Sequence, residues 1–168
     1  MRRECKIKDK EETEGKLQNW LLNAQRVVVA GVGSSLRKDD FIGVEIVRGL
    51  QNKVSSSVYL IECETVPESF IEPIIEFKPT HVLIIDAALL GLKVGAFNLV
   101  EPEQLVGPIV STHFLPLQIF CDYIAKTTGA KIALLAIQPK DISFGEGLTE
   151  GLIKTAKHLT DILLRLLP

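Results

Sequence analysis

Cysteine is scarce in this chain of 168 residues, which has only Cys5, Cys63 and Cys121. An odd number of widely spaced cysteines provides neither a disulfide framework nor the C-x-x-C pair of a metal-binding knuckle. A reducing cytoplasm is therefore the compartment that fits these thiols best.

Long apolar runs are also missing. A membrane-spanning helix needs roughly 18 consecutive apolar residues, and Asp86 interrupts the apolar stretch of residues 82–90. Charged side chains dominate the first 16 residues, where a secretory signal would have an apolar core. The sequence thus predicts neither membrane insertion nor secretion by that route.

An excess of positive charge is absent as well. Lys and Arg total 19 against 21 for Asp and Glu, so the formal net charge is -2. This balance does not favour a nucleic acid or an anionic membrane as a partner. The apolar content of 46% is that of an ordinary globular protein, and the length suits one domain.

What is present begins with an appendage, residues 1–25. Its charged leader predicts a solvated tail to about Lys16. Leu17, Trp20, Leu21 and Ala24 then recur at helical spacing, which predicts a short amphipathic helix docked on the main domain. Residues 26–168 form the single α/β domain.

Short apolar runs and helical patterns alternate from residue 26 onward, as in a layered α/β fold. The predicted strands cover residues 27–32, 58–63, 82–85, 96–100 and 132–137, and the predicted helices residues 42–50, 69–77, 116–126 and 152–167. Apolar runs without alternation are typical of parallel strands that are buried on both faces. The predicted architecture is a three-layer α/β/α sandwich around a five-stranded, mainly parallel sheet.

Chemistry in such a sheet is expected beyond the carboxyl ends of the strands, where loops and helix N-termini converge. Asp40 ends the segment that follows the first strand, Asp86 follows the third, and His113 precedes a helix. Two carboxylates and one imidazole suit a borderline divalent ion such as Ni²⁺, Zn²⁺ or Mn²⁺. The sequence therefore predicts that these three side chains share one edge of the sheet.

Structural roles compete with this interpretation. Asp39 or Asp40 can cap the helix that follows, since aspartate is a preferred N-cap residue. His113 can equally be a hydrogen-bonded loop histidine. Asp86 is harder to assign to structure alone, because a carboxylate directly after four apolar residues is costly to bury without a cation, a proton or hydrogen bonds.

Two other classes of site are weaker. Gly31 and Gly33 after the first strand, with Glu62 at the end of the second, suggest dinucleotide binding, but Leu36 replaces the third glycine of that motif. A serine hydrolase would need a second glycine at position 37 to form the nucleophile elbow around Ser35, but Arg37 stands there.

Four segments in this order match one known family. They are VAGVG running to DDFIG (residues 29–43), LIIDA (residues 83–87), STH (residues 111–113) and AIQP (residues 136–139). The chain resembles the nickel-iron hydrogenase maturation endopeptidases, most closely those serving formate-hydrogenlyase-type hydrogenases. The resemblance spans residue 26 to about residue 165.

The resemblance implies a phosphorylase/hydrolase-like α/β/α fold and a peptidase that removes the C-terminal extension of a hydrogenase large-subunit precursor. It implies that Asp40, Asp86 and His113 are the catalytic and metal-contacting residues, and we expect them to lie in a groove open enough to admit a peptide segment. The nickel is carried by the precursor, and we expect the enzyme's own metal to be absent or loosely held. Two mechanisms stay open. Metal contacted by the aspartates can polarise the scissile carbonyl or a water, or the carboxylates can act directly as general acid and base. In both, the enzyme is an aspartate-dependent (aspartyl) endopeptidase.

Two positions depart from the family pattern, which usually has Asn at Ser34 and Gly at Phe41. Phe41 bears on loop conformation and precursor fit, because only glycine freely adopts a positive φ. A non-catalytic nickel-binding or docking protein and a nucleotide-binding module are the alternative functions.

Overall fold

The computed structural model describes the backbone of residues 2–101, 110–111 and 114–168, and the side chains of residues 11–101 and 117–168. After the first helix, strands and helices alternate as predicted, except that β3, β4 and β5 follow one another. In chain order they are α1 (Arg2–Trp20), β1 (Val27–Val32), the 3-10 helix η1 (Lys38–Phe41), α2 (Ile42–Leu50), β2 (Val58–Glu64), the 3-10 helix η2 (Pro67–Phe70), α3 (Ile71–Phe77), β3 (His81–Leu89), β4 (Phe97–Val100), β5 (Val110–Ser111), α4 (Phe114–Thr128), β6 (Lys131–Ile137) and α5 (Glu150–Leu166).

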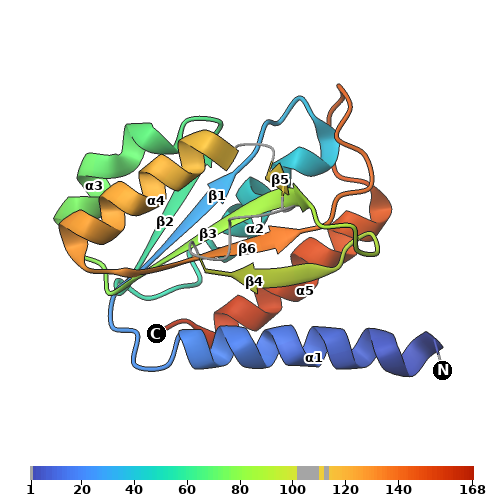
Figure 1. Cartoon of the computed structure of the whole chain (residues 1–168), viewed down its shortest axis with the longest axis horizontal. Coiled ribbons are helices and arrows are strands. Elements are labelled where there is room, and N and C mark those ends of the chain that lie inside the picture. The colour runs from blue at the N-terminus through green and yellow to red at the C-terminus, as the bar shows by residue number, and fades with distance from the viewer. Residues whose placement is uncertain (1, 102–109, 112–113) are drawn as a thin grey trace.

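The strands form one sheet in the order β2-β1-β3-β6-β4 (Figure 1). β1, β2, β3 and β6 are parallel, and β4 pairs antiparallel with β6 at the edge. The two-residue strand β5 pairs antiparallel with the end of β3. The predicted five-stranded, mainly parallel sheet is therefore confirmed.

Helices cover both faces of this sheet. One apolar core contains residues of α2, α5 and the end of α1, and the other contains residues of α3 and α4. All six residues of β1 are buried, as its continuous apolar run predicts. The three-layer sandwich is thus built on two separate cores. No helix in the described part of the chain is long and apolar enough to cross a membrane.

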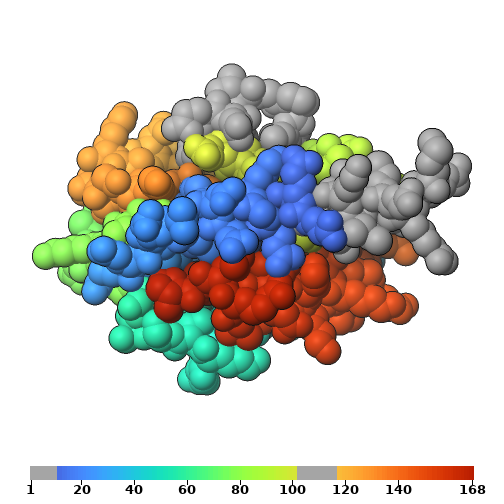
Figure 2. Space-filling view, turned by 90° about the horizontal axis from the view of Figure 1, so that it is seen from below, coloured from blue at the N-terminus to red at the C-terminus, as the bar shows by residue number. Residues whose placement is uncertain are grey.

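The first helix is longer than the sequence pattern predicts. α1 begins at Arg2 and includes the charged leader that we expected to be a solvated tail. It runs along the β4 edge of the sheet (Figure 1), and in Figure 2 it lies between α4 and α5. The Thr13 hydroxyl donates to Phe97 O at 3.4 Å, and Arg165 pairs with Glu14 at 2.6 Å. The charged segment alone has only a weak preference for a helix, and these contacts with the domain stabilise the helical conformation.

β3 also extends further than predicted, through Asp86 to Leu89 instead of ending at Ile85. Pairing with β6 continues to Ala87, and β5 pairs with Ala88 and Leu89. On the other side of β3, the pairing with β1 ends earlier, because the last pair between these two strands is Gly31 with Ile85. Asp86 thus lies within β3, just past the last residue that pairs with β1.

Glycines allow the chain after β1 to approach the sheet closely. A Cβ atom on Gly43 would overlap Ile85 O, and one on Gly33, which has φ +140°, would overlap Asp40 O. These are backbone atoms, so a side chain at either position would force the chain apart. The glycines therefore place η1 and the start of α2 against the carboxyl end of β3.

Candidate active site

Asp40 is fully buried in η1. Its Oδ2 accepts a hydrogen bond from Ser34 N at 2.9 Å, while Oδ1 has no hydrogen-bond partner within the described part of the chain. The N-cap of α2 is Phe41, and no side chain caps that helix. The capping interpretation of Asp40 is therefore wrong, and one of its oxygens is left without compensation for the loss of water.

Asp86 is likewise fully buried. It pairs with Ala136 of β6, and the residue before it, Ile85, meets the backbone of Gly43. Since η1 contacts β3, both predicted carboxylates belong to the carboxyl end of the sheet. The predicted open groove is not found at these residues, because neither carboxylate is exposed to solvent.

His113 lies outside the described residues, so its position is not tested. The described residue Ser111 pairs with Ala88, two residues after Asp86 in β3. Within the described residues no group of three His, Cys, Asp or Glu side chains could hold a metal ion. The predicted trio therefore remains a prediction.

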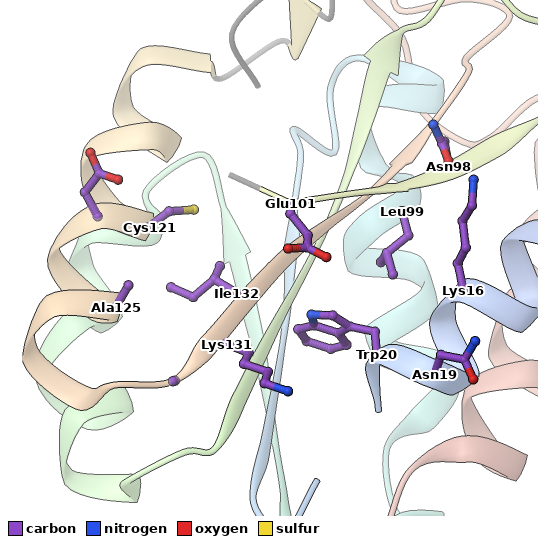
Figure 3. Close-up of a pocket in the computed structure, with 12 residues that line it drawn as sticks. Lys16, Asn19, Trp20, Asn98, Leu99, Glu101, Cys121, Ala125, Lys131 and Ile132 are labelled. Atoms are coloured by element: carbon purple, nitrogen blue, oxygen red, sulfur yellow. The ribbon is translucent and has the colours of Figure 1, made fainter. Parts of the chain in front are cut away.

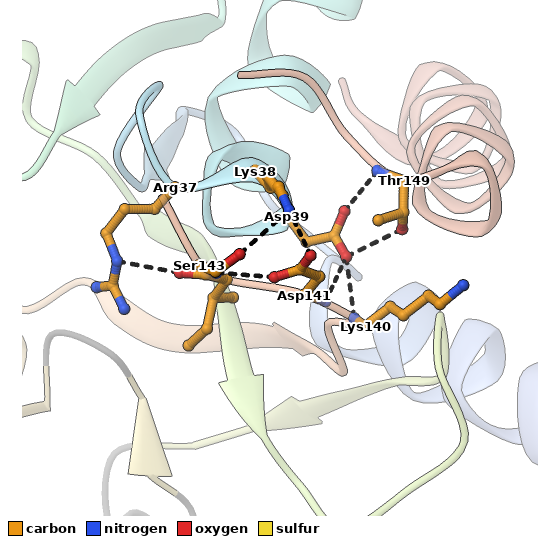
Figure 4. A network of polar contacts seen from close by, with 8 residues as sticks. Arg37, Lys38, Asp39, Lys140, Asp141, Ser143 and Thr149 are labelled. Carbon is orange, nitrogen blue, oxygen red and sulfur yellow. Dashed lines mark hydrogen bonds and ion pairs between the residues drawn. The ribbon is translucent and has the colours of Figure 1, made fainter. Parts of the chain in front are cut away.

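Asp39 has a structural task, but it is not the predicted cap of α2. Its Oδ2 accepts hydrogen bonds from Lys140 N, Asp141 N and the Thr149 hydroxyl, each at 3.0 Å, and its Oδ1 accepts one from Thr149 N at 2.7 Å (Figure 4). Thr149 is the N-cap residue of α5. Asp39 thus joins η1 to the loop after β6 and to the start of α5.

Lys38 strengthens the same junction, and sequence reasoning did not find it. Its Nζ lies 2.5 Å from Asp141 Oδ2 and 3.1 Å from the Ser143 hydroxyl (Figure 4). The hydrogen bond from Lys38, followed by those from Ser143, lowers the pKa of the Asp141 carboxyl well below its usual range. The partners are about 100 positions apart in the chain, so no local pattern predicts this pair.

The residues proposed for dinucleotide binding have other partners. Both oxygens of Glu62 accept bonds from α2, one from Arg48 Nε at 2.9 Å and the other from Gln51 Nε2 at 2.7 Å. In the loop after β1, Gly33 N donates to Glu64 O at 2.7 Å and Ser34 N donates to Asp40. The amides that would hold a pyrophosphate therefore bind the protein's own oxygens.

The buried thiols are unsuited to nucleophilic catalysis. Burial, followed by the charge of Glu68, raises the pKa of Cys63 to about 12, and burial, followed by Asp122, does the same for Cys121. A thiol with such a pKa stays protonated at neutral pH, and only the thiolate is an effective nucleophile.

Phe41 does not require the conformational freedom of glycine. Its φ is −79° and its ψ is 1°, which other residues adopt. The Arg48 guanidinium lies 4.9 Å from the centre of its ring. The departure at Phe41 is therefore compatible with the close approach of η1 to β3.

A cavity of about 830 Å³ lies between α1, α4, β4 and β6 (Figure 3). Trp20 of α1, Leu99 of β4, Cys121 of α4 and Lys131 of β6 are among its lining residues. Lys131 begins β6, whereas Asp86 pairs near the end of that strand. This cavity is thus separate from the candidate active site.

The protein is thus a three-layer α/β/α sandwich with two buried carboxylates, Asp40 and Asp86, at the carboxyl edge of its sheet. The family model for hydrogenase maturation proteases matches residues 44–166. The chain belongs to this hydrogenase maturation protease family, whose members are hydrolases.

Individual relatives agree with this assignment. A protein of Methanocaldococcus jannaschii assigned to the hydrogenase maturation proteases is 37% identical over an alignment of 136 residues, and the match covers 76% of this chain and 80% of that protein. The hydrogenase 3 maturation protease of Escherichia coli is 28% identical over 73% of this chain and 79% of its own length.

A solved structure extends the similarity to the fold. The crystal structure of a NiFe hydrogenase maturation protease from Thermococcus kodakarensis is 33% identical, with a TM-score of 0.84. The match covers 90% of this chain and 97% of that one. The endopeptidase role is thus supported, and neither a docking protein nor a nucleotide-binding module is favoured.

Proposed function

We propose that this protein is a cytoplasmic endopeptidase that removes the C-terminal extension of a nickel-loaded hydrogenase large-subunit precursor. Family membership supports the peptidase activity. The observation that bears most directly on the site is the buried Asp40 carboxylate, whose Oδ1 has no hydrogen-bond partner in the described part of the chain. A cation delivered by the substrate would compensate that charge.

In this proposal the precursor's nickel is part of the substrate, and Asp40, Asp86 and His113 contact it. The nickel would polarise the scissile carbonyl or an attacking water, while the carboxylates orient the metal and accept a proton. Because Asp40 and Asp86 are fully buried, cleavage also requires a rearrangement that exposes them to the precursor. Recognition of the nickel-loaded state and exposure of the carboxylates are therefore coupled.

The test compares nickel-loaded and metal-free precursor, each incubated with the purified full chain and followed by intact mass. We expect loss of the C-terminal extension from the loaded precursor alone. Equal cleavage of both forms would contradict the role of nickel. No cleavage of either form, with a complex still detected, would favour the docking alternative.

A further inference from the structure

Residues 138–149 connect β6 to α5, and hydrogen bonds to η1 hold the part of this loop from Lys140 to Thr149. Asp39 accepts hydrogen bonds from both ends of it, through the amides of Lys140, Asp141 and Thr149. Lys38 binds Asp141 and Ser143 from the same side. The loop is therefore fixed to η1, the element that carries Asp40.

Backbone pairing fixes its tip as well. Gly145 N donates to Leu36 O at 2.8 Å, and Lys38 N donates to Gly145 O at 2.9 Å. Arg37 and Gly145 form an isolated parallel bridge between the two loops. Figure 1 shows the loop after β6 projecting beside the loop that follows β1. The two loops thus form one paired projection at the carboxyl end of the sheet.

Apolar side chains stand at the end of this projection. Phe144 is 82% exposed, the highest value among the exposed large apolar side chains of the described chain, and Leu36 is 48% exposed. A largely exposed phenylalanine on a fixed backbone gains from burial, and little conformational entropy is lost because the loop is already ordered. Exposed aromatic anchors of this kind are typical of interaction sites.

We propose that Phe144 and Leu36 form an apolar anchor that docks the hydrogenase large-subunit precursor beside the scissile segment. This inference rests on the proposed function. Asp39, next to the candidate catalytic Asp40, ties the anchor to the site, so a protein whose C-terminal segment reaches Asp40 meets this projection. The occupant is an apolar patch on the folded precursor. Phe144 has no part in bond cleavage and acts on precursor affinity.

The experiment compares the Phe144→Ala and Phe144→Leu variants with a Leu22→Ala control. Leu22 is 64% exposed and precedes β1 at the opposite end of the sheet. KM and kcat are measured with the nickel-loaded precursor, and Kd is measured in the Asp40→Asn background. We expect Phe144→Ala to raise KM and Kd about tenfold or more, with kcat unchanged and an intermediate effect of leucine.

Three results would overturn the anchor. One is an unchanged KM and Kd for Phe144→Ala, and another is a fall in kcat alone. The third is a change in oligomeric state by sedimentation, which would mean that Phe144 contacts a second copy of this chain. If the wild-type protein does not cleave the precursor but Kd still depends on Phe144, the proposed function fails and the anchor stands.

Discussion

Adjacent aspartates have different tasks at the scale of single residues. Asp39 accepts four hydrogen bonds from the loop after β6 and the start of α5, whereas Asp40 accepts one from Ser34 N. Both are fully buried. The environment of each carboxylate therefore separates a structural residue from a candidate catalytic one.

Replacing Asp39 tests the structural role. Asp39→Asn keeps the shape of the side chain but turns one acceptor into a donor that faces amide groups. Hydrogen bonds to a charged group contribute about 1.5–3 kcal/mol each, so we expect the free energy of unfolding to fall by about 2–4 kcal/mol. Urea denaturation measures this loss. A fall of less than about 0.5 kcal/mol would show that these four hydrogen bonds do not stabilise the contact of η1 with the loop after β6.

Replacing Asp40 tests the catalytic role. Asp40→Asn keeps an oxygen to accept from Ser34 N and removes the negative charge, so we expect cleavage to be lost. The free energy of unfolding should change by less than about 1 kcal/mol. Asp40 Oδ1 has no hydrogen-bond partner among the described residues, so removing the charge breaks no hydrogen bond at that oxygen. Precursor cleavage and urea denaturation are measured on the same preparation. Retained cleavage would remove Asp40 from the mechanism.

At the scale of elements, α1 is attached by its last turns. Leu17 is 1% exposed and Leu21 is 7% exposed, and both belong to the core shared with α2 and α5. Thr13 and Glu14 add contacts with Phe97 and Arg165, in the region that the sequence pattern assigns to a solvated tail. We therefore expect deletion of residues 1–16 to lower stability, contrary to the sequence pattern.

Truncation of Leu17 measures the attachment. We expect Leu17→Ala to lower the free energy of unfolding by about 2–4 kcal/mol, because it leaves a cavity in the core. Leu22→Ala is the matched control, since Leu22 is largely exposed, and it should change stability by less than about 0.5 kcal/mol. Equal effects of the two variants would mean that α1 is not docked through Leu17.

At the scale of the whole molecule, the sequence predicts what local pattern determines. The apolar runs of β1 and β6 predict buried parallel strands, and both are found in the central sheet. The extension of β3 past Asp86 depends on pairing with β5 and β6, and the role of Asp39 depends on residues about 100 positions away. Such contacts leave no periodic signal in either segment.

His81 lies where the appendage meets the sheet. It begins β3, is buried, and meets the Trp20 ring edge-on at 5.0 Å between ring centres. Its Nδ1 lies 3.0 Å from the Thr80 hydroxyl, and Lys131 is its register partner on β6. Burial, followed by the positive charge of Lys131, lowers the pKa of His81 from its ordinary value.

The sign of the resulting effect on stability follows from proton binding. Below the ordinary histidine pKa of about 6.5, the unfolded chain binds a proton at His81 that the folded protein resists. The stabilising contribution of neutral His81 is therefore complete above that pH and declines as the pH falls below it. We expect the melting temperature to fall on acidification from pH 7.5 to 5.5, together with a change in Trp20 fluorescence as α1 loosens.

Two variants separate His81 from other acid-sensitive groups. His81→Gln removes the titrating ring, and Lys131→Gln removes the neighbouring charge that opposes protonation. Both should weaken the dependence of melting temperature on pH over this range, with the larger effect in His81→Gln, because burial contributes more than Lys131 to the lowered pKa. If His81→Gln shows the wild-type dependence, the acid sensitivity lies elsewhere and Trp20 does not report on His81.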